Sequence, residues 1–362
     1  QMFLFFRQVS HLKLNLQKVP DRFKEKISLQ DHQKAINYFF EKIKVRIFST
    51  VIDYALILAL TIGGLISYFV FSLTNFFDFF LSSPLVGSLV VFGAVGSLSF
   101  ITSLPVSIYK QFVIETKFGF NNMSFQTFCL DILKGILLAL IIGGPFLFLL
   151  LWLISQRDLL GSLWWVYLWI IVSLFSMGVQ VLYPILIAPI FNKFSPLEDG
   201  KLRIRLESLL KRCKFSSAGL FLMDGSRRSS HGNAFFAGMG KARRIVLFDT
   251  LVSKLSHSEI EAVLAHELGH YKCGHVPINI ITHLIFSFVV FAAFGSLIDS
   301  TEFYSGLGLG GELLNTQTIY GNSCFMIVFF LVLPIILFPF EPLTSMLSRK
   351  HEFEADSYAA KN

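Results

Sequence analysis

The sequence predicts a mainly helical membrane protein that carries one small soluble domain of mixed α and β structure. Three features support this: the 362-residue chain is 54% hydrophobic, only 15% of its residues are charged, and the apolar residues gather in long runs. Soluble proteins average about 25% charged residues, and a membrane-crossing helix needs about 20 apolar residues. We therefore attribute the low charge content to segments that cross a bilayer.

Several apolar runs are long enough to cross a membrane as helices. They are Val51–Leu73, Leu85–Tyr109, Gly135–Ile154, Leu163–Phe191, Val276–Ile298 and Cys324–Phe340. A shorter apolar segment, Met2–Phe6, precedes them and is too short to cross. We expect this segment to be the end of a further helix.

The basic residues predict how the runs are oriented. If each run crosses once, then of the 31 Lys and Arg residues all but Lys134 and Arg157 fall on one side of the membrane. Cytoplasmic loops are enriched in Lys and Arg, so this side is predicted to be cytoplasmic. The net charge of +7 is then a topology signal with lipid headgroup contact. We expect no nucleic-acid partner, because no aromatic-rich basic motif accompanies the charge.

The longest polar stretch, residues 192–275, is predicted to be the soluble domain. Leucines at helical spacing predict an amphipathic helix over Gly200–Cys213. Three strands are expected over Ala218–Met223, Asn233–Gly238 and Arg244–Phe248. Gly238 and Gly240 favour a turn between the last two of these strands.

A second helix of this domain carries a metal-binding motif. It is expected to begin at Ser258, which has the capping-box spacing with Glu261. The helix contains the sequence HELGH over residues 266–270. Residues four apart stand about 40° apart on a helix, so both imidazoles can bind one zinc ion. Glu267 lies beside that face and is expected to act as the general base on a water molecule.

The third zinc ligand is expected after the last two membrane runs. Two crossings return the chain to the side of HELGH, which brings the acidic segment His351–Asp356 beside it. In a helix Glu352 and Asp356 share a face, whereas Glu354 points about 160° away from Glu352. We therefore predict Glu352 as the ligand and Asp356 as the residue that orients a ligand imidazole. Glu354 as ligand, or a solvated acidic helix end without metal, are the alternatives.

Other histidines are expected to lie outside the site. His275 follows His270 by five residues, which places it on a different face of the helix. His283 lies within an apolar run, where a partnered structural role is favoured over a position on a cavity wall.

Taken together, these motifs resemble those of the CAAX prenyl endopeptidases, a family of integral-membrane zinc proteases. The resemblance runs from about Arg7 to Tyr358. Its specific blocks are Val19–Lys34, Ile114–Asn121, Pro189–Phe194, Ser229–Ala234, Arg244–Thr250, Ala262–His270 and Ser348–Asp356. It implies a ring of seven transmembrane helices that encloses a water-filled intramembrane chamber, with Met2–Phe6 as the represented part of the first helix.

The resemblance also implies an activity, namely endoproteolytic removal of the last three residues after a prenylated cysteine. One zinc ion would be held by His266, His270 and Glu352. Glu267 would be the catalytic base, and Asp356 would be the acid of the outer shell.

Substrate binding is expected at the segment His231–Phe236. This segment can present a strand edge to which an extended peptide adds by backbone pairing. Asn233 or His231 is then expected to donate a hydrogen bond to the developing oxyanion. A loop-capping role is the equal alternative for both residues.

The expected organisation has four parts. Residues 1–191 form transmembrane helices and cytoplasmic loops, 192–275 the cytoplasmic metalloprotease domain, 276–343 a transmembrane hairpin and 344–362 the third-ligand helix. The zinc site would lie on the cytoplasmic side of the membrane. That membrane would be the endoplasmic reticulum in a eukaryote or the inner membrane in a bacterium.

Three other functions are compatible with the sequence. A membrane quality-control zinc protease would use the same chemistry without needing a prenyl group, so only a substrate comparison separates it. A multi-pass transporter with an accidental HExxH motif would bind no zinc. A non-catalytic scaffold would bind zinc without turnover.

Overall fold

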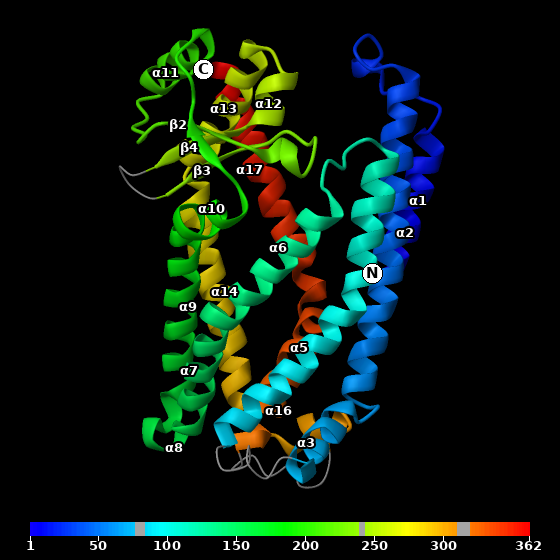
Figure 1. Ribbon diagram of the computed structural model, residues 1–362, viewed down its shortest axis with the longest axis vertical. Coiled ribbons are helices and arrows are strands. Elements are labelled where there is room, and N and C mark those ends of the chain that lie inside the picture. Colours follow the sequence, from blue (N-terminus) through cyan, green and yellow to red (C-terminus); the bar gives the residue numbers. More distant parts are fainter. Residues whose placement is uncertain (77–83, 239–242, 310–318) are drawn as a thin grey trace. The chain divides into compact units, whose positions relative to one another are not determined.

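The computed structural model describes residues 1–76, 84–238, 243–309 and 319–362 (Figure 1). The chain divides into two compact units. The first comprises Gln1–Asn121 and the segment that begins at Thr301, and the second comprises Asn122–Ser300 and the C-terminal segment that ends at Asn362.

The first unit is helical. Its described elements are α1 (Met2–Asn15), η1 (Asp21–Phe23), α2 (Leu29–Leu60), α3 (Leu65–Phe76), α5 (Pro84–Tyr109), η2 (Lys110–Glu115) and α15 (Thr301–Gly306). Ser28 caps α2, because its side chain accepts a hydrogen bond from the backbone N–H of Asp31 at 3.0 Å. The axis bends by 53° between α2 and α3. Gly64, with φ +72°, lies at this break and allows the left-handed turn.

The second unit contains the remaining described helices. They are α6 (Phe125–Leu138), η3 (Ala139–Gly143), α7 (Gly144–Ser155), α8 (Arg157–Leu160), η4 (Gly161–Leu163), α9 (Trp164–Leu182), η5 (Tyr183–Ile187), α10 (Ala188–Phe191), α11 (Lys201–Arg212), η6 (Gly225–Arg227), α12 (Asp249–Lys254), α13 (His257–Lys272), α14 (His275–Leu297), α16 (Ile319–Leu337), η9 (Phe338–Phe340) and α17 (Glu341–Lys361). Helices α9 and α14 lie side by side (Figure 1), and Trp169 Nε1 of α9 donates to Ser287 Oγ of α14 at 3.1 Å.

Within the described residues, five helical stretches are long and apolar enough to cross a membrane, or up to six if α2 and α3 form one bent span. They coincide with the six runs predicted from the sequence. The helices extend beyond the apolar runs because their polar ends continue the same backbone hydrogen bonding. The last stretch, Gly321–Lys361, passes through η9 directly into α17.

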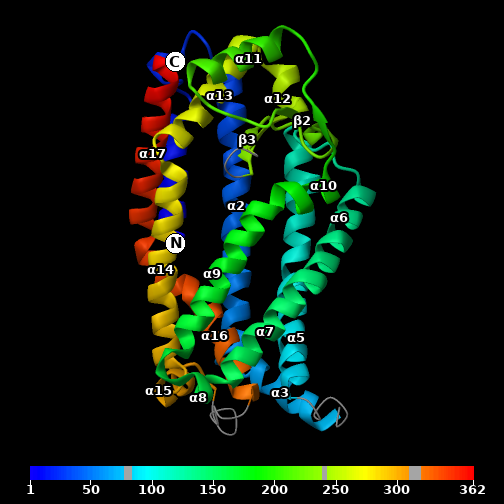
Figure 2. The same ribbon diagram turned by 90° about the vertical axis from the view of Figure 1, so that its left-hand side faces the viewer.

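A four-stranded sheet lies in the second unit, and the short helices of the soluble part lie at the same end of that unit's long helices as the sheet (Figure 2). The strands are β1 (Phe194–Pro196), β2 (Leu220–Met223), β3 (Ala234–Ala237) and β4 (Arg244–Phe248). Their order is β1-β2-β4-β3, with β2 and β4 parallel and the other two pairs antiparallel. The three predicted strands form, while β1 was not predicted. The turn expected at Gly238–Gly240 falls largely outside the described residues.

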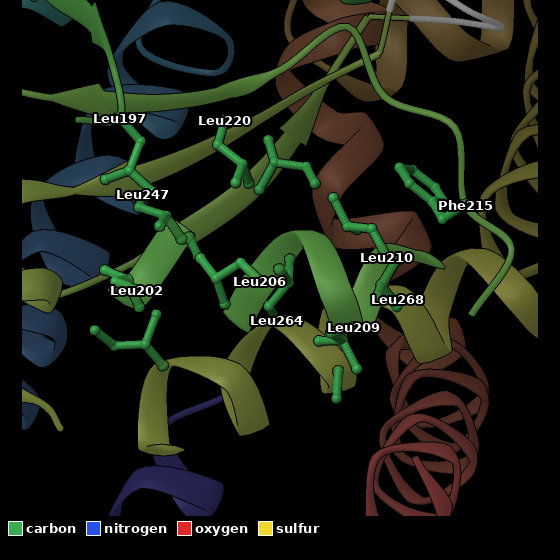
Figure 3. Packing of buried hydrophobic residues seen from close by; sticks show 14 of the residues in the cluster. Leu197, Leu202, Leu206, Leu209, Leu210, Phe215, Leu220, Leu247, Leu264 and Leu268 are labelled. Carbon is green, nitrogen blue, oxygen red and sulfur yellow. The ribbon is translucent and has the colours of Figure 1, made fainter. Parts of the chain in front are cut away.

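Leucine side chains build the core between the sheet and two helices (Figure 3). Helix α11 directs Leu202, Leu206, Leu209 and Leu210 into this core, as its predicted amphipathic pattern requires. Leu264 and Leu268 of α13 pack into the same cluster. Each fully buried leucine contributes about 1.5–3 kcal/mol relative to exposure. The core therefore fixes α13, the helix that carries HELGH.

The start of α13 differs from the prediction. Ser256, not Ser258, is the N-cap, and its capping-box partner is Glu259, not Glu261. The backbone of Ser256 is extended, with φ −66° and ψ 158°, so the helix begins two residues earlier than it would with Ser258 as the cap. Glu261 instead pairs with Arg205 and Arg212 of α11. Both serine–glutamate pairs have the same spacing, but Glu259 accepts from the backbone N–H of Ser256 at 2.8 Å, whereas Glu261 is engaged by α11.

Candidate metal centre

Three side chains from two helices converge at one point of the second unit. His266 and His270 lie four residues apart on α13, and their Nε2 atoms are 3.1 Å apart. Glu352 of α17 reaches both, with one carboxylate oxygen 3.4 Å from His266 Nε2 and the other 3.7 Å from His270 Nε2. One ligand atom from each residue lies within 4.8 Å of the others. The geometry predicted from sequence spacing is therefore present.

A glycine allows α17 to approach α13 this closely. A Cβ atom placed on Gly269 would lie 2.8 Å from both Cα and the carbonyl oxygen of Ala355. These contacts are with backbone, which cannot rotate away as a side chain can. Ala355 is itself fully buried. The Gly269–Ala355 contact thus sets the helix separation that brings Glu352 to the two histidines.

Asp356 holds the first histidine. Its carboxylate lies 2.8 Å from Nδ1 of His266. A carboxylate only accepts, so Nδ1 carries the proton and Nε2 keeps its lone pair. The lone pair then points towards Glu352 and His270.

The second histidine has partners that the sequence analysis did not foresee. Nδ1 of His270 lies 3.0 Å from Nδ1 of His275, and Nε2 of His275 lies 2.9 Å from Glu354. The expectation that His275 lies on another face assumed a continuous helix. Helix α13 instead ends at Lys272, and Gly274 turns the chain with φ +73°. Gly274 was the available sequence signal, because glycine commonly ends a helix.

The general-base candidate is half-buried beside the histidines. Burial raises the pKa of Glu267 above its ordinary value, the charge of His266 opposes this rise, and Glu352 adds to it. A carboxylate with a raised pKa holds a proton more strongly, which suits a group that must accept one and later donate it. Burial also lowers the pKa of His270, which favours the neutral imidazole that binds a metal ion.

The two oxyanion candidates lie on the segment before β3. Thr250 Oγ1 donates to the carbonyl oxygen of His231 at 2.8 Å, and the N–H of Phe248 donates to that of Asn233 at 3.0 Å. The Asn233 side chain accepts from the N–H of Ala234 at 2.9 Å. Both side chains are exposed. In the described part of the chain, neither belongs to the group of side chains able to share one ion.

The converging residues fit a catalytic metal ion. Two neutral imidazoles and one carboxylate are a common donor set of catalytic zinc, which leaves a fourth position for water or substrate. The hydrogen bonds to Nδ1 of both imidazoles direct both Nε2 atoms inward. The donor chemistry and the orientation of the rings therefore both agree with a metal site.

Two family models together cover almost the whole chain. Residues 8–193 match the CAAX prenyl protease N-terminal domain, described as five membrane helices, and residues 196–362 match peptidase family M48. The chain belongs to peptidase family M48. It is a metalloprotease and a multi-pass integral membrane protein, and the family implies a metal ion at the site. The family resemblance inferred from the sequence blocks is confirmed.

Curated relatives carry the same description. The CAAX prenyl protease 1 of Saccharomyces cerevisiae is 36% identical over 376 residues, covering 100% of this chain and 82% of the relative. The Dictyostelium discoideum homolog is 33% identical, with 99% and 82% covered. The Homo sapiens homolog is 33% identical, with 73% of this chain and 61% of the relative covered. The chain thus spans about four fifths of the first two relatives and about three fifths of the human one.

A solved structure shares the fold. The crystal structure of S. mikatae Ste24p superposes with a TM-score of 0.86 at 32% sequence identity. The match covers 99% of this chain and 86% of the other.

Proposed function

We propose that this protein is a zinc endopeptidase that removes the C-terminal tripeptide of prenylated CAAX proteins. The observation that carries the proposal is the convergence of His266, His270 and Glu352 on one point. The names of the relatives support the substrate class, because several are CAAX prenyl protease 1 or its homologs. The match over both family models supports the same assignment.

The proposed ligands are His266, His270 and Glu352, with one zinc ion per chain. Bound zinc would supply Lewis-acid chemistry, because it polarises a peptide carbonyl and lowers the pKa of a water molecule to about 7. The residues of this chain do the remaining work. Asp356 keeps the imidazole of His266 in the required tautomer and orientation.

Glu267 is the proposed general base. It accepts the proton of the attacking water and passes it to the leaving amine when the peptide bond breaks. Its burial keeps bulk water away and raises its pKa, which strengthens it as a base. Its position next to His266 on α13 places it beside the ligand face of the helix.

Strand β3 is the proposed binding edge for the substrate. It is the last strand in the order β1-β2-β4-β3, so one edge faces away from the described sheet. An extended peptide can add to such an edge through backbone hydrogen bonds. His231 and Asn233 precede this strand, and we propose that one of them donates to the oxyanion during cleavage.

We further propose that the site faces the cytoplasm and that seven transmembrane helices surround an intramembrane chamber. The distribution of Lys and Arg supports the orientation, and the likeness to Ste24p supports the helical arrangement. Residues 192–275 and 344–362 would then form the catalytic part, and 1–191 and 276–343 the membrane part. The membrane would be the endoplasmic reticulum in a eukaryote or the inner membrane in a bacterium.

A peptide-cleavage assay tests the function. The purified protein is incubated with a farnesylated CAAX peptide and with the unmodified peptide of the same sequence, each with and without a zinc chelator. We expect the farnesylated peptide to be cut with a much higher kcat/KM and the chelator to abolish cleavage. Equal cleavage of both peptides would favour a quality-control protease. No zinc in the purified protein would favour a transporter, and zinc without turnover would favour a scaffold.

A further inference from the structure

We propose that His275 and Glu354 form a relay that positions the imidazole of His270 for metal binding. The inference rests on the proposed metal centre and adds two positioning residues to it. Glu354 would orient His275, and His275 would orient His270. The relay gives the second histidine ligand the support that Asp356 gives the first.

The three groups form a continuous line of contacts. His270 Nδ1 is 3.0 Å from His275 Nδ1, and His275 Nε2 is 2.9 Å from the Glu354 carboxylate. His270 Nε2, at the other end of its ring, faces His266 and Glu352. The line therefore begins at a carboxylate and ends at the ligand atom.

With neutral imidazoles, only one assignment of protons satisfies both contacts of this line, His270 with His275 and His275 with Glu354. The Glu354 carboxylate accepts, so His275 must carry its proton on Nε2. Its Nδ1 is then an acceptor, so His270 must donate through Nδ1. The lone pair of His270 is thereby left on Nε2, where a metal ion would bind. The chain of contacts thus selects the ligand tautomer.

The middle group is held firmly enough to transmit this orientation. The side chain of His275 is only 2% exposed. Its ring stacks on that of His351, with centroids 4.0 Å apart and planes within 14°. Lys350 Nζ lies 3.8 Å from the other carboxylate oxygen of Glu354. Neither ring can turn without losing the stacking or a hydrogen bond inside a buried site.

The relay explains why Glu354 lies on the opposite side of α17 from Glu352. His275 begins α14, immediately after the turn at Gly274. That turn places His275 beyond α13, on the side of α17 that Glu354 faces. The acidic residues at 352, 354 and 356 therefore have three separate partners: the metal position, His275 and His266.

Zinc affinity of the purified full chain is the direct test, measured by competition with a chelator of known affinity. The variants are Glu354→Gln, His275→Leu, the double variant, and Glu341→Gln as a control that removes a carboxylate elsewhere on α17. Outer partners of ligand histidines contribute about 10–100-fold to metal affinity. We expect His275→Leu to weaken binding within this range, Glu354→Gln to weaken it by about 10-fold, and Glu341→Gln to leave it unchanged.

The double variant tests the order of the relay. If Glu354 acts only through His275, the double variant binds zinc no more weakly than His275→Leu alone. Independent effects would instead multiply, because non-interacting sites are additive in free energy. Multiplied losses would overturn the relay.

A conservative variant separates positioning from folding. In His275→Gln the amide can accept from His270 and donate to Glu354, so we expect zinc affinity nearer to wild type than in His275→Leu. Without zinc, the variants should unfold at the same temperature as the zinc-free wild type. Affinity losses that only follow losses in the stability of the zinc-free protein would overturn the proposal, as would wild-type affinity in both His275→Leu and Glu354→Gln. If the wild type itself binds no zinc, the proposed metal centre fails, and that result differs from failure of the relay alone.

Discussion

Helices α13 and α17 both supply the metal centre, but they are held in place by different forces. Helix α13 buries Ile260, Leu264 and Leu268 in the leucine-rich core of the soluble part. Helix α17 buries only His351 and Ala355 among its 21 residues, and it continues directly from a membrane-crossing helix. Helix α13 is therefore fixed by several fully buried side chains, whereas α17 reaches the same core only through the partly buried Tyr358 and Ala359 and otherwise relies on contacts at the site.

The difference indicates how the site is assembled. The pair His266 and His270 is preformed, because the core holds α13 whether or not a metal is bound. The carboxylate of Glu352 depends on the Gly269–Ala355 contact and on the pairing of Asp356 with His266. Metal binding should therefore order α17 more than α13.

The largest expected effect is the loss of turnover when Glu267 is replaced, because this residue of α13 is the proposed general base and binds no metal. Glu267→Gln should retain zinc, because the three proposed ligands on both helices remain. The turnover rate should fall by about 10²–10⁴-fold, since the proton acceptor is lost. Zinc content and kcat on a farnesylated peptide measure the two properties. Glu261→Gln, on the same helix but paired with α11, is the control that should keep normal turnover, and unaltered turnover in Glu267→Gln would refute its role as base.

Removal of the metal tests the difference between the helices. A ligand at about 1,000 times its dissociation constant stabilises the folded state by about 4 kcal/mol. Chelation should lower the unfolding temperature accordingly. Hydrogen exchange should accelerate in α17 around residues 349–358 and change little over residues 260–268 of α13. Equal acceleration in both helices would show that the core does not hold α13 independently.

The helix contact at Gly269 gives the next effect. Gly269→Ala places a methyl group against the backbone of Ala355, and overpacking of this kind costs about 1–3 kcal/mol. Because α17 is the less firmly held helix, it should shift and weaken zinc binding. Gly178→Ala in α9 is the matched control, since a Cβ there meets nothing within 4 Å. The unfolding temperature and the zinc affinity are measured for both variants, and both should fall only in Gly269→Ala. Equal values in the two variants would argue against the close contact of Gly269 with Ala355.

The smallest effect concerns the attachment of α13 to α11. Burial opposes ionisation of Glu261, yet Arg205 and Arg212 lower its pKa below the ordinary value of 4.5. A carboxylate with a lowered folded-state pKa adds stability above its unfolded-state pKa, and this stability is lost as the pH falls through the folded-state value. Glu261→Gln should therefore cost up to about 1 kcal/mol near neutral pH. The difference from wild type in unfolding temperature should vanish as the pH falls below the folded-state pKa of Glu261. A difference that persists there would mean that the loss does not come from the charge of Glu261.

Local patterns predicted much of this protein. The four-residue spacing predicted that His266 and His270 share a helix face, and the even number of membrane crossings predicted that Glu352 lies beside them. The structure places all three together. Strand β4 has the predicted bounds, because a short apolar run between polar residues has few other solutions.

The missing features depend on contacts distant in sequence. The choice between Ser256 and Ser258 as N-cap is decided by the pairing of Glu261 with α11. The role of His275 depends on its contact with Glu354, 79 residues further along the chain, in addition to the local turn at Gly274. Strand β1 has only three residues and exists because it pairs with β2.

Anomalous X-ray scattering at the zinc absorption edge, from crystals of the purified protein, tests the central claim most directly. The account predicts one peak per chain, about 2.0–2.2 Å from Nε2 of His266, Nε2 of His270 and a carboxylate oxygen of Glu352. A peak bound by the two histidines with Glu352 turned away, or no peak at this position, would contradict it.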